Sequence, residues 1–308
     1  MTGAYVRMAL AMLLVGSYLV ASKIILQFVP LFTAAFARQA LAFVALAGWL
    51  AWKRAPVSIG GGRDRWVLLM QAFVGVFLYS VLSLYGVQWI SGVAANVLMA
   101  LTPAAVGLVG LLLFRERMGS AESLCLVLAV CGAVITQLGD ESGQLGGSTF
   151  KIWLGAGLIV LSVFSEAVFL TFGKMLRQPL PSTVLSLVLT LLGSLMFLPF
   201  MLYEVPHWRA STVPWYVWGL MLYSGVAITA LAVVLMNSAM KVVPTTSAAV
   251  FTALIPLSGV GLSVLLLGDA LRFQHVLGAA LVLGGMLFSV LRQQSRQGQA
   301  RSMEGGGA

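Results

Sequence analysis

The sequence predicts an all-α polytopic membrane protein in which ten transmembrane helices form two inverted five-helix repeats. Hydrophobic residues make up 60% of the 308-residue chain, charged residues only 9%, and the mean hydropathy is +1.00. Apolar segments fill almost the whole chain, and its two halves resemble each other at an offset of about 153 residues. Because so little polar surface cannot keep a fold of this size in water, the bilayer must be its solvent.

Ten segments are apolar and long enough to span a bilayer, which requires roughly 20 helical residues. They lie near residues 4–27, 31–52, 66–89, 91–114, 120–138, 152–173, 181–203, 213–238, 243–267 and 273–291. The first segment lacks a small-residue cleavage site followed by a polar mature domain. We therefore expect it to be a spanning helix and not a signal peptide.

Basic residues predict the orientation, because Lys and Arg are retained on the cytoplasmic side of short loops. With the N-terminus inside, 13 of the 18 basic residues fall on inner segments, namely Arg7, Lys53, Arg54, Arg63, Arg65, Arg115, Arg117, Lys174, Arg177, Lys241, Arg292, Arg296 and Arg301. The outer segments hold Lys23, Lys151, Arg209 and Arg272. We expect a multi-pass protein of the inner (plasma) membrane with both termini cytoplasmic. The net charge of +9 is then mostly a topology signal, and nucleic acid is not an expected partner.

The internal repeat keeps one register over about fifty residues. The offset of about 153 aligns Pro103 with Pro256, Glu116 with Asp269, and Gly132 with Gly285. Because each half holds five helices, the second copy is upside down relative to the first. We expect a first repeat over 1–142, a second over 143–293, and a disordered cytoplasmic tail over 294–308. Inverted repeats place a substrate site near the midplane and expose it alternately to each side.

These residues carry a family resemblance. The stretch through Ala95, Pro103, Glu116, Leu124 and Gly132 and its second copy through Ala248, Pro256, Asp269, Gly278 and Gly285 resemble the repeated signature of EamA-type transporters in the drug/metabolite transporter (DMT) superfamily. A basic residue early in the second helix, here Arg38, is also similar, whereas Cys125 in the first copy departs from Gly278 in the second. The resemblance implies export of small metabolites such as amino acids, or of drugs. It also implies a cavity bounded chiefly by helices 3, 4, 8 and 9, with helices 5 and 10 on the outside.

The two aligned prolines lie near the centres of the fourth and ninth segments. Pro103 and Pro256 each remove one backbone donor and leave the carbonyls of Met99 and Thr252 without their usual partners. We expect the pair to form a hinge that shapes the cavity. A proline that is merely tolerated in a membrane helix is the alternative.

Two ionisable residues lie deep within the predicted spans. Arg38 lies about 10 Å below the outer end of the second helix at a rise of 1.5 Å per residue. A charge there costs about 2.5 kcal/mol or more unless it meets a wet cavity or a partner, so we expect Arg38 in the substrate cavity or outer gate, with snorkelling as the alternative. Glu166 is the only acid deep within a predicted span. Its burial suits proton coupling, and the alternative is a hydrogen-bonded structural acid.

Further polar side chains mark a candidate substrate cavity. They are Tyr79 and Ser83 on one face of the third helix, Asn96 on the fourth, and Tyr223 and Asn237 on the eighth. Such groups bind amino or carboxyl groups by hydrogen bonds. They equally serve as helix-to-helix hydrogen bonds, which is the commoner use of Ser and Asn in membranes.

The sequence lacks the motifs that would indicate catalysis. The sequence holds no Walker-type phosphate loop, and neither His207 nor His275 belongs to a metal-ligand spacing, so we expect no cofactor, no metal site and no enzyme. We expect a secondary active transporter that exports small metabolites, amino acids above all, by alternating access. One deep Arg, one deep Glu and several hydroxyls suit a small zwitterion better than a polyanion. A proton-coupled exporter of drugs or cationic compounds is the alternative, and a channel or a membrane-embedded enzyme are alternatives of another class.

Overall fold

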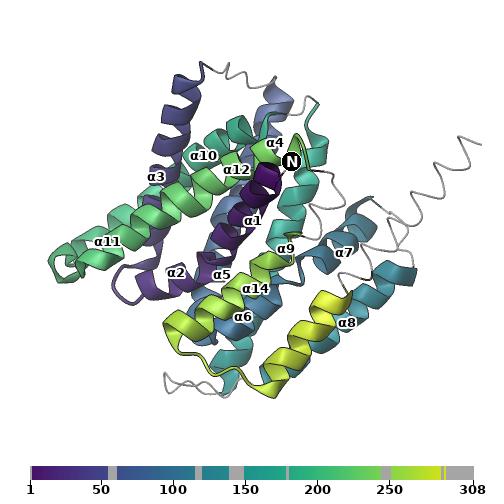
Figure 1. The fold of residues 1–308 in the computed structure, drawn as a ribbon. Coiled ribbons are helices and arrows are strands. Elements are labelled where there is room, and N and C mark those ends of the chain that lie inside the picture. Colours follow the sequence, from purple (N-terminus) through teal and green to yellow (C-terminus); the bar gives the residue numbers. More distant parts are fainter. Residues whose placement is uncertain are drawn as a thin grey trace, which may run out of the picture.

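The computed structural model describes residues 2–54, 61–114, 120–138, 149–177, 180–243, 251–285 and 288, which form a bundle of helices (Figure 1). Within these residues, six helices are long and apolar enough to span a membrane, or seven if a bent pair counts as one span. The prediction of an all-helical polytopic membrane protein is confirmed. The count of ten spans stays a prediction, because the fifth, ninth and tenth segments appear as the shorter apolar helices Ser123–Gln137, Leu254–Leu267 and Phe273–Gly285. The expected tail over 294–308 lies outside the described residues.

The first half builds its spans from several short elements. The first span consists of α1 (Thr2–Gly16) and α2 (Tyr18–Ile25), and the second is α3 (Leu31–Trp52). The third consists of α4 (Gly62–Ala72), the π-helical turns of η1 (Phe73–Leu78) and α5 (Tyr79–Trp89). The fourth is the bent pair α6 (Gly92–Met99) and α7 (Thr102–Phe114), and α8 (Ser120–Leu138) follows.

The second half repeats this plan. Its described elements are α9 (Thr149–Phe172), η2 (Gly173–Met175), α10 (Ser182–Glu204), η3 (Val205–His207), η4 (Ala210–Thr212), α11 (Trp215–Leu222), η5 (Tyr223–Leu231), α12 (Ala232–Met240), α14 (Leu254–Leu262) and η6 (Ser263–Leu267). The helix Phe273–Gly285 comes last.

Irregular turns recur at matching places in the two halves. The third span contains the π-helical η1, and the eighth contains the π-helical η5. In the fourth span a new helix, α7, begins one residue before Pro103, and in the ninth a new helix, α14, begins two residues before Pro256. π-Helical turns are rare and often accompany functional sites, so their repetition at corresponding positions fits an internal repeat that serves one site.

The two halves interleave. In the described contacts α3 packs along α10, α5 along α9, and α1 against both α12 and α14. One apolar core therefore contains side chains from both halves, including Leu98, Val163 and Phe197. At the edge of the molecule α8 lies beside the C-terminal yellow helix (Figure 1), where Gly132 and Gly278 bring the two backbones together. A Cβ on either glycine would lie 2.6 Å from the carbonyl oxygen of the other.

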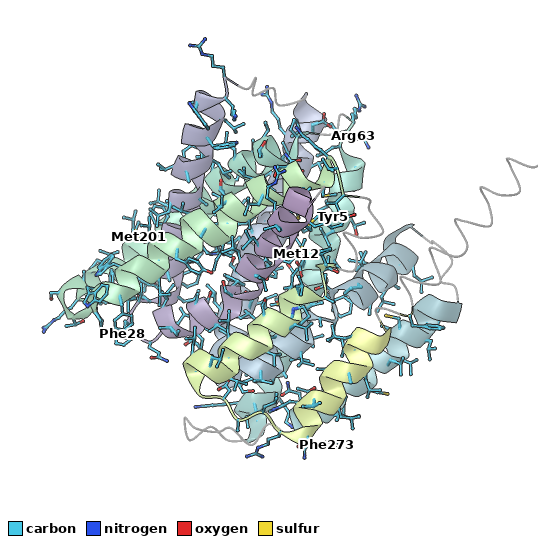
Figure 2. The ribbon with its side chains drawn as sticks, in the orientation of Figure 1. Tyr5, Met12, Phe28, Arg63, Met201 and Phe273 are labelled. Atoms are coloured by element: carbon cyan, nitrogen blue, oxygen red, sulfur yellow. The ribbon has the colours of Figure 1, made fainter. Side chains whose placement is uncertain are left out.

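Apolar side chains also cover the outside of the bundle (Figure 2). Trp215, Leu265 and Phe273 are 85%, 78% and 76% exposed. Such surface would aggregate in water, and it is the expected lining of a lipid-facing bundle. In Figure 2, Phe28 before α3 and Arg63 in α4 lie toward opposite ends of the bundle, as a spanning α3 requires.

Candidate substrate site

The first span has an irregular turn at Ser17, where its polar side chains meet those of other spans. α1 ends at Gly16 and α2 begins at Tyr18, with Ser17 between them. Gly16 lies against α14, because a Cβ built there would collide with the Ile255 carbonyl. The Ser17 hydroxyl is hydrogen-bonded to the Tyr223 hydroxyl of η5 at 2.9 Å. The first span is thereby tied to the eighth at the depth of its π-helical turns.

Tyr18 connects three residues that the sequence proposed separately. Its hydroxyl is hydrogen-bonded to that of Ser83 at 3.3 Å. Its ring stacks on Tyr79 with the ring centroids 6.2 Å apart. The guanidinium carbon of Arg38 lies 4.8 Å from the centroid of the Tyr18 ring, a favourable cation–π distance. The structure therefore gathers Arg38, Tyr79 and Ser83 around one buried tyrosine.

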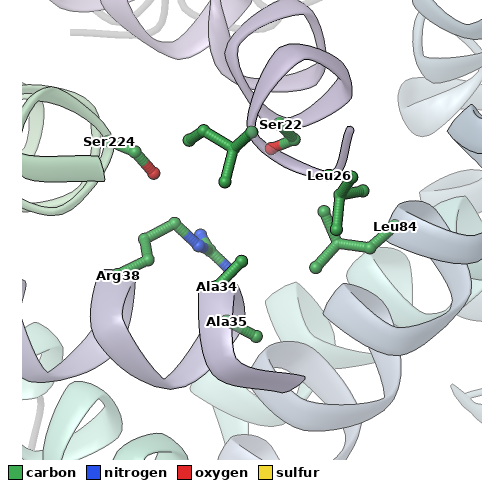
Figure 3. A pocket seen from close by; sticks show the side chains of 8 residues that line it. Ser22, Leu26, Ala34, Ala35, Arg38, Leu84 and Ser224 are labelled. Atoms are coloured by element: carbon green, nitrogen blue, oxygen red, sulfur yellow. The ribbon is translucent and has the colours of Figure 1, made fainter. Parts of the chain in front are cut away.

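Arg38 borders a hollow inside the bundle (Figure 3). Its Nη2 donates to Ser80 Oγ at 2.7 Å, and Ser80 is completely buried. The hollow is small, with a volume of about 10 Å³. It is lined by Ser22, Ile25, Leu26, Ala34, Ala35, Arg38, Leu84 and Ser224. Within this lining Arg38 is the only charged side chain, and Ser22 and Ser224 add hydroxyls. The placement matches the cavity interpretation of Arg38, whose part in substrate binding stays a prediction.

Tyr79 interacts electrostatically with both deep ionisable residues. It begins α5, directly after the π-helical turns of η1. It lies within electrostatic range of Glu166, Tyr18 and Arg38. The Tyr79 hydroxyl is thus close enough to interact electrostatically with both the carboxyl of Glu166 and the guanidinium of Arg38.

Glu166 meets the break in the fourth span. Its Oε2 lies 2.9 Å from the hydroxyl of Thr102, the first residue of α7. The same hydroxyl lies 2.8 Å from the carbonyl oxygen of Met99, the last residue of α6. Met99 is the residue whose carbonyl loses its usual donor because Pro103 carries no N–H. Thr102 therefore contacts both the carboxyl and the bend.

The prolines lie at helix starts and not inside continuous helices. The fourth span bends by 41° between α6 and α7, and Pro103 is the second residue of α7. Pro256 is the third residue of α14. A proline is well tolerated there, because the first N–H groups of a helix have no partner within it. The sequence placed both prolines within continuous helices, and this is corrected: each belongs to the first turn of a new helix.

Of the predicted cavity residues, Arg38 lines the hollow, and Tyr79, Ser83 and Tyr223 contact Ser17 or Tyr18. Asn96 and Asn237 make neither of these contacts in the described structure. Asn96 Nδ2 donates to the Gly92 carbonyl at 2.9 Å and to Ser263 Oγ at 3.4 Å, between α6 and η6. Its amide also occupies the place where a Cβ on Gly259 would lie. Asn96 thus serves helix contact, the alternative stated from sequence. Asn237 lies on α12, about 20 Å further along the eighth span than Tyr223 at 1.5 Å per residue.

Acidic side chains from the second half cap helices of the first half. Asp269 Oδ2 accepts from the backbone N–H groups of Gly92 at 2.6 Å and Val93 at 3.2 Å, at the N-terminus of α6. Glu204 accepts from Phe32 N–H at 3.2 Å and Thr33 N–H at 2.7 Å, at the N-terminus of α3. A carboxylate at a helix N-terminus satisfies open donors and complements the helix dipole. Both caps hold the two halves together at the end of the bundle where α3 begins.

The Asp269 cap leads to a stability prediction. Replacing Asp269 with Ala leaves two α6 donors without their acceptor and is expected to cost about 1 to 2 kcal/mol, a typical value for a lost cap. Thermal unfolding of the purified protein in detergent measures the loss as a lower midpoint. Asp269→Asn keeps one acceptor oxygen and should recover much of it. An Ala variant as stable as the unmodified protein would contradict the cap.

Sequence reasoning missed four of the polar residues described above, namely Ser17, Tyr18, Ser80 and Thr102. Ser17 and Tyr18 belong to the first span, which the resemblance did not place beside the cavity. Ser17 and Tyr18 could have been identified from the run Gly16–Ser17–Tyr18, because its small and polar residues interrupt an otherwise apolar segment. Thr102 was signalled by its position directly before Pro103, and Ser80 by its neighbour Tyr79.

The sequence of the chain matches a known protein family and two curated relatives. The model of the EamA-like transporter family matches the chain twice, over residues 2–138 and 153–291. These matches are offset by 151 residues at their starts and 153 at their ends, as the sequence repeat predicts. An uncharacterized transporter of Bacillus subtilis strain 168, YetK, is 34% identical over 292 residues, which cover 95% of this chain and 88% of YetK. An uncharacterized transporter of Archaeoglobus fulgidus is 25% identical over 244 residues, which cover 78% of this chain and 84% of the relative.

A solved structure shares the fold. A protein whose structure is titled only "Crystal structure of protein" superposes with a TM-score of 0.66 at 16% identity. The match covers 96% of this chain and 98% of that chain. At such low identity the likeness concerns the fold alone.

Proposed function

The chain belongs to the EamA-like transporter family, and we propose that it is a secondary active transporter that exports amino acids or similarly small metabolites. The family and the relatives are named as transporters, which are not enzymes. Its substrate is therefore a small molecule, and its setting is the membrane. The proposal adds the substrate class, the direction, and transport by alternating access.

The observation that carries the substrate class is the hollow with its single cation. Arg38 offers donors to a carboxylate, and guanidinium–carboxylate contacts are among the strongest hydrogen bonds in proteins. Ser22 and Ser224 add hydroxyls for an ammonium or a polar side chain. With a volume of about 10 Å³ the hollow has room for about one water molecule, so a substrate requires it to widen. The single cation favours a small anion or zwitterion as the molecule that enters it.

The charge of the hollow also weighs against the alternative of a cationic drug. A cationic drug would place a second positive charge beside Arg38 in a poorly solvated space, where like charges repel strongly. We also propose proton coupling through Glu166 for a zwitterion, because Tyr79 interacts electrostatically with both this carboxyl and Arg38.

Alternating access is proposed from the arrangement of the breaks. The irregular turns of the third, fourth, eighth and ninth spans lie where helices of both halves meet, and Pro103 and Pro256 begin the helices after two of them. We propose these prolines as hinges. The distribution of basic residues supports a plasma-membrane protein with cytoplasmic termini.

Counterflow in proteoliposomes tests the proposal. Vesicles containing the purified protein are loaded with one unlabelled amino acid at a time, and entry of the same labelled compound is followed with protein-free vesicles as control. Saturable exchange of one or more amino acids is the expected result, because a carrier returns loaded in each direction. Flux that rises linearly with concentration would indicate a channel. Absence of exchange in folded protein would remove the amino-acid assignment.

A further inference from the structure

The hydroxyl of Thr102 has two acceptors and one hydrogen. Met99 O lies 2.8 Å and Glu166 Oε2 lies 2.9 Å from Thr102 Oγ1. A threonine hydroxyl donates one hydrogen bond and accepts others. If the carboxyl is ionised it only accepts, so one of the two contacts must lose its hydrogen. Both can be satisfied together only when Glu166 is protonated and donates to Thr102, which then donates to Met99.

The Met99 carbonyl is the point where the fourth span breaks. Four residues later the nitrogen of Pro103 has no hydrogen, so the usual helical donor to this carbonyl is missing. Thr102 supplies a substitute donor next to the 41° bend. Inside a membrane a carbonyl without a partner is costly, so the direction of this one hydroxyl influences how stable the bend is.

We propose that Thr102 is a positioning residue that couples proton occupancy of Glu166 to the bend between α6 and α7. When the carboxylate takes up a proton, it donates to Thr102 Oγ1, and the threonine hydrogen turns to Met99 O and stabilises the bent span. When the proton leaves, the threonine hydrogen turns to the carboxylate, and the Met99 carbonyl loses its donor. The inference rests on the proposed proton coupling and gives it a structural target.

Among the described residues around Glu166, Thr102 is the one that connects its carboxyl to the bend between α6 and α7. Among described side chains on the elements packed against α9, Tyr79 of α5 lies within electrostatic range of the carboxyl, and Arg38 and Tyr18 lie within electrostatic range of Tyr79. The described residues of α6, α7 and η1 contain no titratable side chain. α8 contributes the thiols Cys125 and Cys131. The charged residues of α4, namely Arg63, Asp64 and Arg65, lie in its first turn, where Asp64 accepts from the backbone of Arg177.

The test compares Thr102→Val, which keeps the shape and removes the hydroxyl, with Thr102→Ser, which keeps the hydroxyl. The readout is the ratio of uptake driven by a pH gradient to exchange at equal pH in proteoliposomes, which corrects for any general loss of activity. The ratio is expected to fall about tenfold in Thr102→Val, the factor typical of one hydrogen bond to a charged group, and to recover in Thr102→Ser. Pro103→Ala should also lower it, because a backbone N–H would then serve Met99 whatever Glu166 does.

Infrared titration of the carboxyl band gives an independent readout in the same proteins. In Thr102→Val the band should still rise on acidification, at a shifted frequency, because its hydrogen-bond partner is gone. A gradient response that survives in Thr102→Val would overturn the inference. So would a band that no longer titrates, because Thr102 would then act on proton binding itself. If Glu166→Gln keeps the gradient response, the proton coupling at Glu166 fails, and this inference fails with it.

Discussion

Replacing Arg38 with Ala is expected to lower kcat/KM for substrate exchange by about tenfold to a hundredfold, the loss typical of a hydrogen-bonded contact to a charged group. Arg38 is the single charged side chain in the described lining of the hollow, and its guanidinium already points inward to Ser80 and Tyr18. Initial rates of counterflow at several concentrations of the identified substrate measure the effect. A matched control is Arg7→Ala, since Arg7 is exposed and donates to the Gly3 carbonyl at the start of α1.

Stability distinguishes a binding role for Arg38 from a structural one. A guanidinium inside a membrane costs about 2.5 to 3.5 kcal/mol on insertion scales, so its removal should leave the thermal midpoint nearly unchanged or slightly higher. Arg38→Lys keeps the charge and loses the paired donors, and should restore only part of the exchange. An Arg38→Ala protein that unfolds at much lower temperature, with full exchange in the surviving fraction, would assign the residue to structure.

The sequence predicted the membrane class and the repeat because both depend on composition and spacing along the whole chain, and neither requires knowledge of tertiary contacts. A bilayer demands long apolar helices, and the two family matches are offset by 151 and 153 residues, close to the repeat of about 153 found in the sequence. The breaks were less visible. Whether a helix becomes irregular at Ser17 or bends near Ala100 depends on tertiary contacts, such as the close approach of Gly16 to α14, and these join residues far apart in sequence.

The candidate site was predicted only in part, because an apolar membrane helix gives no periodic signal for the face that points inward. Arg38, Tyr79 and Ser83 were identified by residue type and lie together. Asn96 has equally suitable chemistry, yet it faces η6 and Gly259. Tyr18 was missed because a tyrosine in a first apolar span has the same pattern as one facing lipid. Rotation of each helix about its axis decides these cases, and packing between the halves sets that rotation.

Replacing Glu166 with Gln is expected to uncouple transport from the pH gradient while exchange at equal pH persists. The carboxamide resembles the protonated acid and cannot release a proton, so Thr102 keeps one hydrogen-bonding arrangement. A gradient of about one pH unit supports up to about a tenfold substrate accumulation per coupled proton, since a factor of ten corresponds to 1.4 kcal/mol. Accumulation by the unmodified protein is expected to approach that factor, and Glu166→Gln should give none.

Glu204 offers the matched carboxyl for this experiment. It accepts hydrogen bonds from the N-terminus of α3, and Thr102 is not among its described partners, so Glu204→Gln removes a charge without touching the coupling contact. This variant should keep the gradient response and lose about 1 kcal/mol of stability through the weaker cap. Loss of the response in both variants would point to the general charge balance of the bundle. Its loss in Glu166→Gln alone would identify the Glu166 proton as the one that drives transport, because only that carboxyl contacts the bend of the fourth span among the described acids.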